Sequence, residues 1–77
     1  MSTTDNIRKV MRNDPRCELL EAVARLNEGL LFESRKGSHW QLKAPGKRPV
    51  FFTVCRTDHR AVRNMRTELR QAGYVIP

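Results

Sequence analysis

The sequence predicts a small α+β domain whose elements follow the order α-β-β-β-α. Two observations predict it. Apolar residues recur at helical spacing over 16–28 and again over 59–72, whereas the segments between them alternate or are rich in β-branched and aromatic residues. Each helical segment has one apolar stripe, so we expect two helices packed on one face of a three-stranded antiparallel sheet. A chain of 77 residues suits one such domain with a thin core.

The first expected helix follows Asn13-Asp14-Pro15, a capping residue and a proline of the kind that begins helices. Gly29 ends it. Its apolar stripe consists of Leu19, Ala22, Val23 and Leu26. Residues 1–12 lack a convincing apolar period, so we expect a loose or weakly helical N-terminal arm there and a single domain over 13–77.

Three short segments predict the strands: LLFES at 30–34, HWQLKA at 39–44 and PVFFTVC at 49–55. They are separated by the turns RKGS and PGKR, which favours an antiparallel meander. Alternation assigns side chains to the two faces. The face toward the helices receives Trp40, Leu42, Val50, Phe52 and Val54, and the open face receives His39, Gln41, Lys43, Phe51 and Thr53.

The second expected helix begins at Thr57-Asp58 and ends at Gly73. Its apolar stripe consists of Val62, Met65, Leu69 and Ala72. At about 100° per residue, four arginines fill one continuous arc beside that stripe. This arginine arc, which we expect to follow nucleic-acid phosphates, consists of Arg60, Arg63, Arg66 and Arg70.

The charge is one-sided along the chain. The net charge is +7, but residues 1–34 carry five basic and six acidic side chains, whereas residues 35–70 carry ten basic and two acidic ones. Such a field attracts polyanions, and solubility alone does not need it. No segment has the apolar length of a membrane span or the apolar centre of a signal peptide, so we expect a cytoplasmic protein.

The cysteines and histidines suggest no metal site or cofactor. Cys17 and Cys55 lie far apart and outside any CxxC pattern, so each is interpreted as a small buried apolar residue. No carboxylate cluster and no pair of histidines has the spacing of metal ligands.

A more specific pattern runs from Gly29 through Lys36-Gly37-Ser38-His39 to a closing Leu69-Arg70-Gln71-Ala72-Gly73. With the first helix, this pattern covers roughly residues 16–75 and resembles the HicA family of bacterial toxins, small ribonucleases that cleave messenger RNA. The resemblance implies a fold like that of double-stranded-RNA-binding domains and a HicB-like antitoxin as protein partner. It also implies that His39 is catalytic. Many members have a further histidine near the position of Cys55, and His59 is not assigned its role.

The expected chemistry is general acid or base catalysis by His39, whose imidazole exchanges a proton near neutral pH. Lys36 and Lys43 would steady the phosphate, and the backbone N–H groups of Gly37 and Ser38 would help to hold its oxygens. Two alternatives stay open. One is a non-catalytic module that binds double-stranded RNA or DNA, in which His39 is only a surface residue after a turn; the other is a basic adaptor for an acidic protein.

Overall fold

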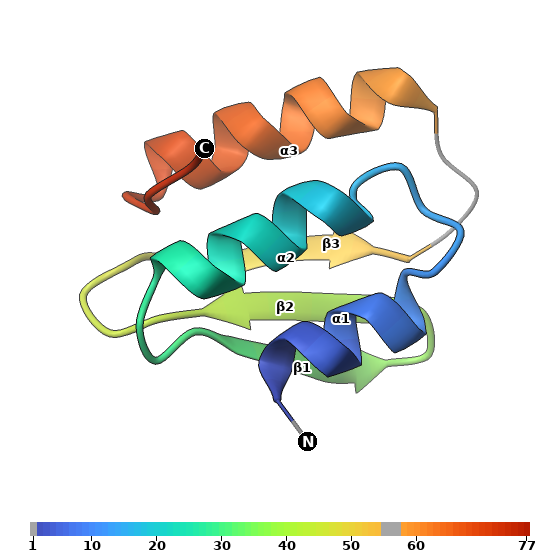
Figure 1. The fold of residues 1–77 in the computed structure, drawn as a ribbon, viewed down its shortest axis with the longest axis horizontal. Helices are drawn as coiled ribbons and strands as arrows, with labels where there is room; N and C mark the ends of the chain where they lie inside the picture. Colours follow the sequence, from blue (N-terminus) through green and yellow to red (C-terminus); the bar gives the residue numbers. More distant parts are fainter. Residues whose placement is uncertain (1, 55–57) are drawn as a thin grey trace.

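The computed structural model describes residues 2–54 and 58–77. Its sheet has the order β1-β2-β3, with β1 at Leu31–Lys36, β2 at His39–Lys43 and β3 at Val50–Thr53. Both strand pairs are antiparallel. The helices are α1 at Thr3–Val10, α2 at Cys17–Leu26 and α3 at His59–Gln71. In Figure 1 the helices form a layer over one face of the sheet, with α1 over β1 and α3 beside β3. The α+β class and the order α-β-β-β-α from α2 onward are confirmed.

The N-terminal segment is a helix and not a loose arm. The hydroxyl of Ser2 accepts a 3.1 Å hydrogen bond from the N–H of Asp5, which caps α1. Ile7 and Met11 are 0% and 1% exposed and belong to the core. These two residues are four apart, and one turn of helix places them on the same side. The expectation of two helices on the sheet is therefore corrected to three within the described residues.

Helix α2 begins later than expected and buries a different stripe. Its first residue is Cys17, so the turn at 13–15 precedes the helix and does not cap it directly. Leu19, Leu20 and Val23 are buried, whereas Leu26 is 48% exposed. The buried stripe is thus rotated by part of a turn from the predicted one. Helix α1 packs beside α2, and the sequence pattern of α2 alone does not reveal this neighbour.

A buried asparagine ends α2 and attaches the C-terminal segment. The amide nitrogen of Asn27 donates to the carbonyls of Val23 at 2.7 Å and Val75 at 2.8 Å, and its oxygen accepts from the N–H of Val75 at 2.9 Å. The side chain is therefore a second donor to the Val23 carbonyl, which also accepts from the backbone N–H of Asn27 at 3.0 Å, and it ties the end of α2 to Val75. Gly29 follows with a φ of +81°, and an added Cβ there would lie 3.1 Å from Pro45.

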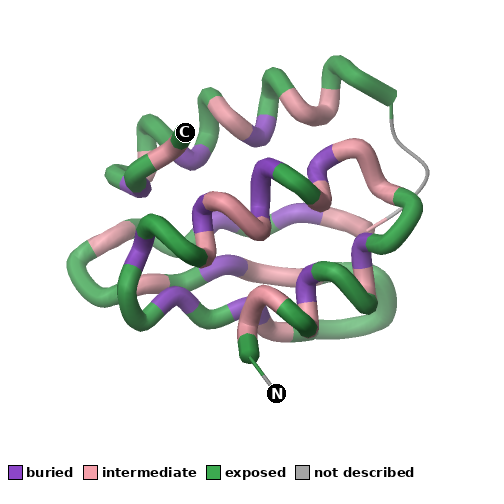
Figure 2. Tube along the Cα trace, viewed as in Figure 1, coloured by how far each residue is buried: buried purple, intermediate pink, exposed green. Residues whose placement is uncertain are grey.

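The sheet faces are arranged as the alternation predicted. Phe32, Leu42, Val50 and Phe52 are buried in the core, and Figure 2 shows the buried positions of the whole trace in purple. Trp40 is half-buried and stacks on Phe32 with ring centroids 4.4 Å apart. Phe51 points the other way and is 54% exposed. The face that carries His39 is thus left uncovered by the helices.

An ion pair between Arg16 and Asp14 is almost entirely buried, with side chains 6% and 5% exposed. The guanidinium donates to both carboxylate oxygens of Asp14, at 3.0 and 2.7 Å. It also donates to the carbonyl of Thr53 at 2.9 Å and lies 5.3 Å from the ring centre of Phe52. The turn before α2 is therefore joined directly to the end of β3.

Helix α3 has the predicted start signal and apolar stripe. The Asp58 carboxylate accepts a 3.0 Å hydrogen bond from the N–H of Arg60, whereas Thr57 lies outside the described residues. Met65 and Leu69 are 3% and 0% exposed. After Gly73, at a φ of +94°, the N–H of Tyr74 donates to the carbonyl of Leu69 at 3.0 Å, as in a Schellman motif.

Cys17 forms no disulfide and lies half-buried beside the core. Burial, followed by the charge of Glu21, raises the pKa of its thiol. Cys55 lies outside the described residues. No helix in the described part of the chain has both the length and the apolar character needed to cross a membrane.

The buried ion pair generates the first prediction. Asp14→Asn keeps the shape of the side chain but removes the charge that compensates Arg16. Loss of one partner of a buried pair costs about 3 to 5 kcal/mol, so we expect a lower free energy of unfolding in urea. The control is Glu28→Gln, an exposed carboxylate, which should change stability by less than about 0.5 kcal/mol. Equal stability of the two variants would show that the pair is dispensable.

The second prediction concerns Tyr74, a residue that is 5% exposed and whose hydroxyl donates to the carbonyl of Leu42 at 3.1 Å. Burial raises its pKa above the ordinary value of 10.0. As the pH rises, the unfolded chain therefore loses the hydroxyl proton of Tyr74 before the folded chain does. The stabilisation of the folded state that comes from this pKa difference is present below the ordinary pKa and is lost as the pH rises through the pKa of the folded state.

Tyr74→Phe should accordingly lower the free energy of unfolding by about 0.5 to 1.5 kcal/mol near neutral pH through the lost hydrogen bond. The difference in unfolding free energy between the two proteins should then narrow as the pH rises above about 10 toward the raised pKa of the folded protein, because only the natural protein has a tyrosine to ionise at this position. Urea unfolding followed by circular dichroism measures both effects. A gap that stays constant over this range would contradict the assignment.

Candidate functional site

The turn after β1 places His39 at the start of β2. Gly37 has a φ of +59°, whereas Ser38 does not have a positive φ. A positive φ at the first central residue alone is the pattern of a type II′ hairpin turn, which suits the twist of the flanking strands. The carbonyl of Ser38 accepts from the N–H of Val54 at 2.8 Å. The turn is thereby attached to the residue that follows β3.

A β-bulge in β1 brings two cations beside His39. Ser34 pairs with Trp40, but Lys36 rather than Arg35 pairs with His39, so β1 has one extra residue at this point. Two residues of one strand therefore oppose one residue of the next. Arg35 and Lys36 are both exposed. The bulge is the local feature that gathers positive charge at the position of the histidine.

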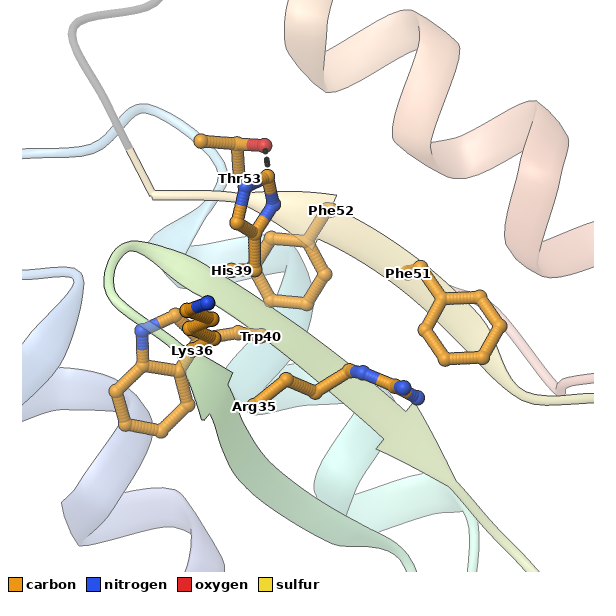
Figure 3. Close-up of a pocket in the computed structure, with 7 residues that line it drawn as sticks. All are labelled: Arg35, Lys36, His39, Trp40, Phe51, Phe52 and Thr53. Carbon is orange, nitrogen blue, oxygen red and sulfur yellow. Dashed lines mark hydrogen bonds between the residues drawn. The ribbon is translucent and has the colours of Figure 1, made fainter.

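These residues line an open hollow of about 350 Å³ on the uncovered face (Figure 3). Its lining consists of Arg35, Lys36, His39, Trp40, Phe51, Phe52 and Thr53. The set combines two cations, one imidazole and three aromatic residues, and it contains no carboxylate. Of the three aromatic residues, Phe51 presents its ring on the open face, whereas Phe52 is buried and Trp40 stacks on Phe32. Its volume is in the range of small-ligand sites. The chemistry suits an anion attached to a flat apolar group.

The imidazole of His39 is exposed and lies against β3. Its Nδ1 is 3.4 Å from the hydroxyl oxygen of Thr53, its partner in the strand register. This contact is long for a hydrogen bond, so it orients the ring only weakly. With Nδ1 directed at Thr53, Nε2 is the nitrogen left for proton exchange with a ligand.

Arg35 extends across the sheet toward β3, as Figure 3 shows. Its Nη1 donates to the side-chain oxygen of Gln41 at 3.0 Å, and its guanidinium carbon lies 4.9 Å from the ring centre of Phe51. The amide nitrogen of Gln41 in turn donates to Glu33 at 3.1 Å. A hydrogen-bonded row thus runs from β1 across β2 and holds the guanidinium over the phenyl ring.

Lys43 does not join His39. It is the last residue of β2, whereas His39 is the first, and four residues of strand span about 13 Å. Its Nζ lies 3.5 Å from a carboxylate oxygen of Glu33, with which it forms an exposed ion pair. The expectation that Lys36 and Lys43 steady one phosphate is therefore corrected: the structure brings Lys36 to His39 and leaves Lys43 at the far end.

The arginine arc is also separate from His39. Arg60, Arg63 and Arg70 are exposed and Arg66 is half-buried. Arg63 and Arg66 line a groove of about 810 Å³ between α2 and α3, which also contains Glu18 and Asp14. Arg66 donates to the carbonyl of Pro77 at 3.1 Å. The arc belongs to the helical layer, whereas His39 lies on the opposite face of the sheet.

Comparison with protein-family models, with curated proteins and with solved structures finds no match. The likeness to HicA toxins consequently rests on the sequence motifs alone. Within residues 2–54 and 58–77, no three His, Cys, Asp or Glu side chains gather as metal ligands would.

Sequence reasoning counted Arg35 among the basic residues but gave it no place in the site. Its signal is weak, because simple alternation from Glu33 predicts only that it shares the open face. The bulge and the contact with Phe51 depend on the register of all three strands, which no local pattern reveals. Phe51 and Thr53, by contrast, were placed on the face of His39 by alternation, and this is confirmed.

The third prediction tests the dependence of His39 on the turn. Gly37 and Gly46 both have a positive φ and open space around the position of a Cβ. An alanine at either position should therefore cost a similar backbone strain, about 1 to 2 kcal/mol. Only Gly37→Ala should shift the nuclear magnetic resonance signals of the His39 ring, because Gly46 lies in the turn between β2 and β3. Equal displacement of those signals in both variants would contradict a local role for the Gly37 turn.

Proposed function

We propose that this chain is a HicA-like toxin, a metal-independent endoribonuclease that cleaves messenger RNA in the cytoplasm. The observation that carries the proposal is the placement of His39. The one imidazole in the Lys-Gly-Ser-His motif lies in an exposed hollow beside two cations, on the sheet face that the helices leave uncovered. This face is accessible to a long polymer.

The chemistry needs few groups because RNA supplies its own nucleophile. In the proposed step, Nε2 of His39 takes the proton of a 2′-hydroxyl, whose oxygen attacks the adjacent phosphorus. The bond from phosphorus to the 5′-oxygen breaks, which leaves a 2′,3′-cyclic phosphate and a 5′-hydroxyl that receives a proton from water. The protonated His39 then returns its proton to the hydroxide so formed, which restores the neutral imidazole. Lys36 and Arg35 would stabilise the negative charge that develops on the phosphate oxygens.

Regulation would follow from the same exposure. A HicB-like antitoxin that covers the hollow would exclude RNA from His39 and thereby hold the enzyme inactive. The uncovered sheet face supports this part of the proposal, since a partner can reach the histidine without opening the fold.

A second candidate is a non-catalytic module that binds double-stranded RNA or DNA. The observation in its favour is that the arginine arc lies on the helical layer, away from His39. Exposed arginines along one helix suit phosphate contacts. This candidate predicts strongly salt-dependent binding that does not change when His39 is replaced.

The fourth prediction separates the two candidates. Purified His39→Ala should cleave a labelled messenger RNA fragment about 10²- to 10⁴-fold more slowly than the natural protein, since that is the typical contribution of general acid–base catalysis. The matched control is His59→Ala, which removes the chain's other histidine, exposed at the start of α3. This variant should retain full activity. The assay contains a metal chelator, which should leave the natural rate unchanged.

Circular dichroism establishes that both histidine variants are folded. Retained cleavage in folded His39→Ala would remove this residue from the mechanism. Binding of RNA by all three proteins without any cleavage would favour the non-catalytic module.

A further inference from the structure

Phe51 is exposed in a way that core packing does not explain. Its ring lies on the uncovered face, and the residue is 54% exposed. A single exposed apolar residue is ordinary on a protein surface, and Leu31 on the same face is 49% exposed. Phe51 differs from Leu31 because a guanidinium is held 4.9 Å from its ring centre by a hydrogen bond to Gln41.

This arrangement forms a preorganised flat surface. Arg35 would otherwise be a flexible surface side chain, but its Nη1 donates a hydrogen bond to the side-chain oxygen of Gln41. The amide nitrogen of Gln41 in turn donates to the carboxylate of Glu33. Guanidinium planes and phenyl rings are the two surfaces on which proteins stack unpaired RNA bases. Here a guanidinium and a phenyl ring occur together. The guanidinium also adds positive charge to the hollow that contains His39, where the phosphate of a bound RNA would lie.

The distance to the histidine fits one short stretch of RNA. In the strand register His39 faces Thr53 and Gln41 faces Phe51, so His39 and Phe51 are diagonal neighbours on one face. Such positions lie about 7 to 8 Å apart. A base on Phe51 and the sugar–phosphate group at His39 can therefore belong to the same or adjacent nucleotides.

We propose that Arg35 and Phe51 form a stacking site for one unpaired base, so that the substrate of the hollow is single-stranded RNA. This inference rests on the proposed function for the identity of the polymer, and it adds the strandedness of the substrate and the residues that select it. Bases within a duplex are stacked on one another, so an A-form helix has no base to offer to the pair.

The test measures binding of the full chain to a short 2′-O-methyl oligouridylate, which cannot be cleaved because its 2′-oxygen is blocked. Phe51→Ala should weaken binding about 5- to 150-fold, the value of one base–aromatic stack. Phe51→Leu, which keeps an apolar side chain of similar volume but has no ring, should lose as much. The matched control is Leu31→Ala, which removes an equally exposed apolar side chain from the other end of the same face and should leave binding unchanged.

A second probe isolates the base. An abasic oligomer of the same length keeps the phosphates, so it should bind the natural protein and Phe51→Ala equally. Equal weakening of both probes by Phe51→Ala would overturn the proposal, as would unchanged binding of the oligouridylate or an equal loss for an RNA duplex. Loss of affinity for a protein partner alone would also overturn it.

The outcomes separate this inference from the proposed function. Loss of cleavage in His39→Ala with no effect of Phe51→Ala on binding would leave the ribonuclease in place and remove the base site. Base-dependent binding through Phe51 in a protein that cleaves no RNA would keep the stacking site and remove the enzyme.

Discussion

The structure depends most on the buried guanidinium of Arg16. Strand β3 has four residues and lies at the edge of the sheet, so β2 is its only strand partner among residues 2–54 and 58–77. Arg16 holds the outer side of β3 through the carbonyl of Thr53 and lies against the ring of Phe52, while Asp14 neutralises its charge. A buried ion pair adds little net stability compared with an apolar contact, but it becomes costly when half of it is removed. The role of the ion pair in this fold is to fix the position of β3 against the turn that precedes α2.

That position reaches the candidate site through one residue. The carbonyl of Thr53 is bound by Arg16 on the edge of the sheet, and the hydroxyl of the same residue contacts His39 on the open face. Thr53 thus contacts the buried ion pair through its backbone and the candidate site through its side chain. Thr53 is therefore the residue that connects the buried ion pair to His39, although the contact between its hydroxyl and the ring is long at 3.4 Å.

The sequence was sufficient where one element sets its own pattern. Alternation in β2 and β3 placed His39, Phe51 and Thr53 on one face, and the period of α3 identified Met65 and Leu69 as core residues. The sequence was insufficient where the position of a residue depends on the packing of two elements that are distant in the chain. Helix α1 and its C-cap residue contribute only Ile7 and Met11 to the buried core, too few for a visible period. Lys43 is likewise separated from His39 because the two residues lie at opposite ends of β2. A count of charged residues on one face does not take this distance along the strand into account.

The stack between Trp40 and Phe32 has a spectroscopic consequence. Trp40 is the only tryptophan of the chain, and its ring packs on the core at one side while the residue also lines the hollow beside His39. Its emission is therefore sensitive to two different events, the solvation of the core when the chain unfolds and the exclusion of water when a ligand enters the hollow. The protein thus has its single tryptophan at the boundary between its core and its candidate site.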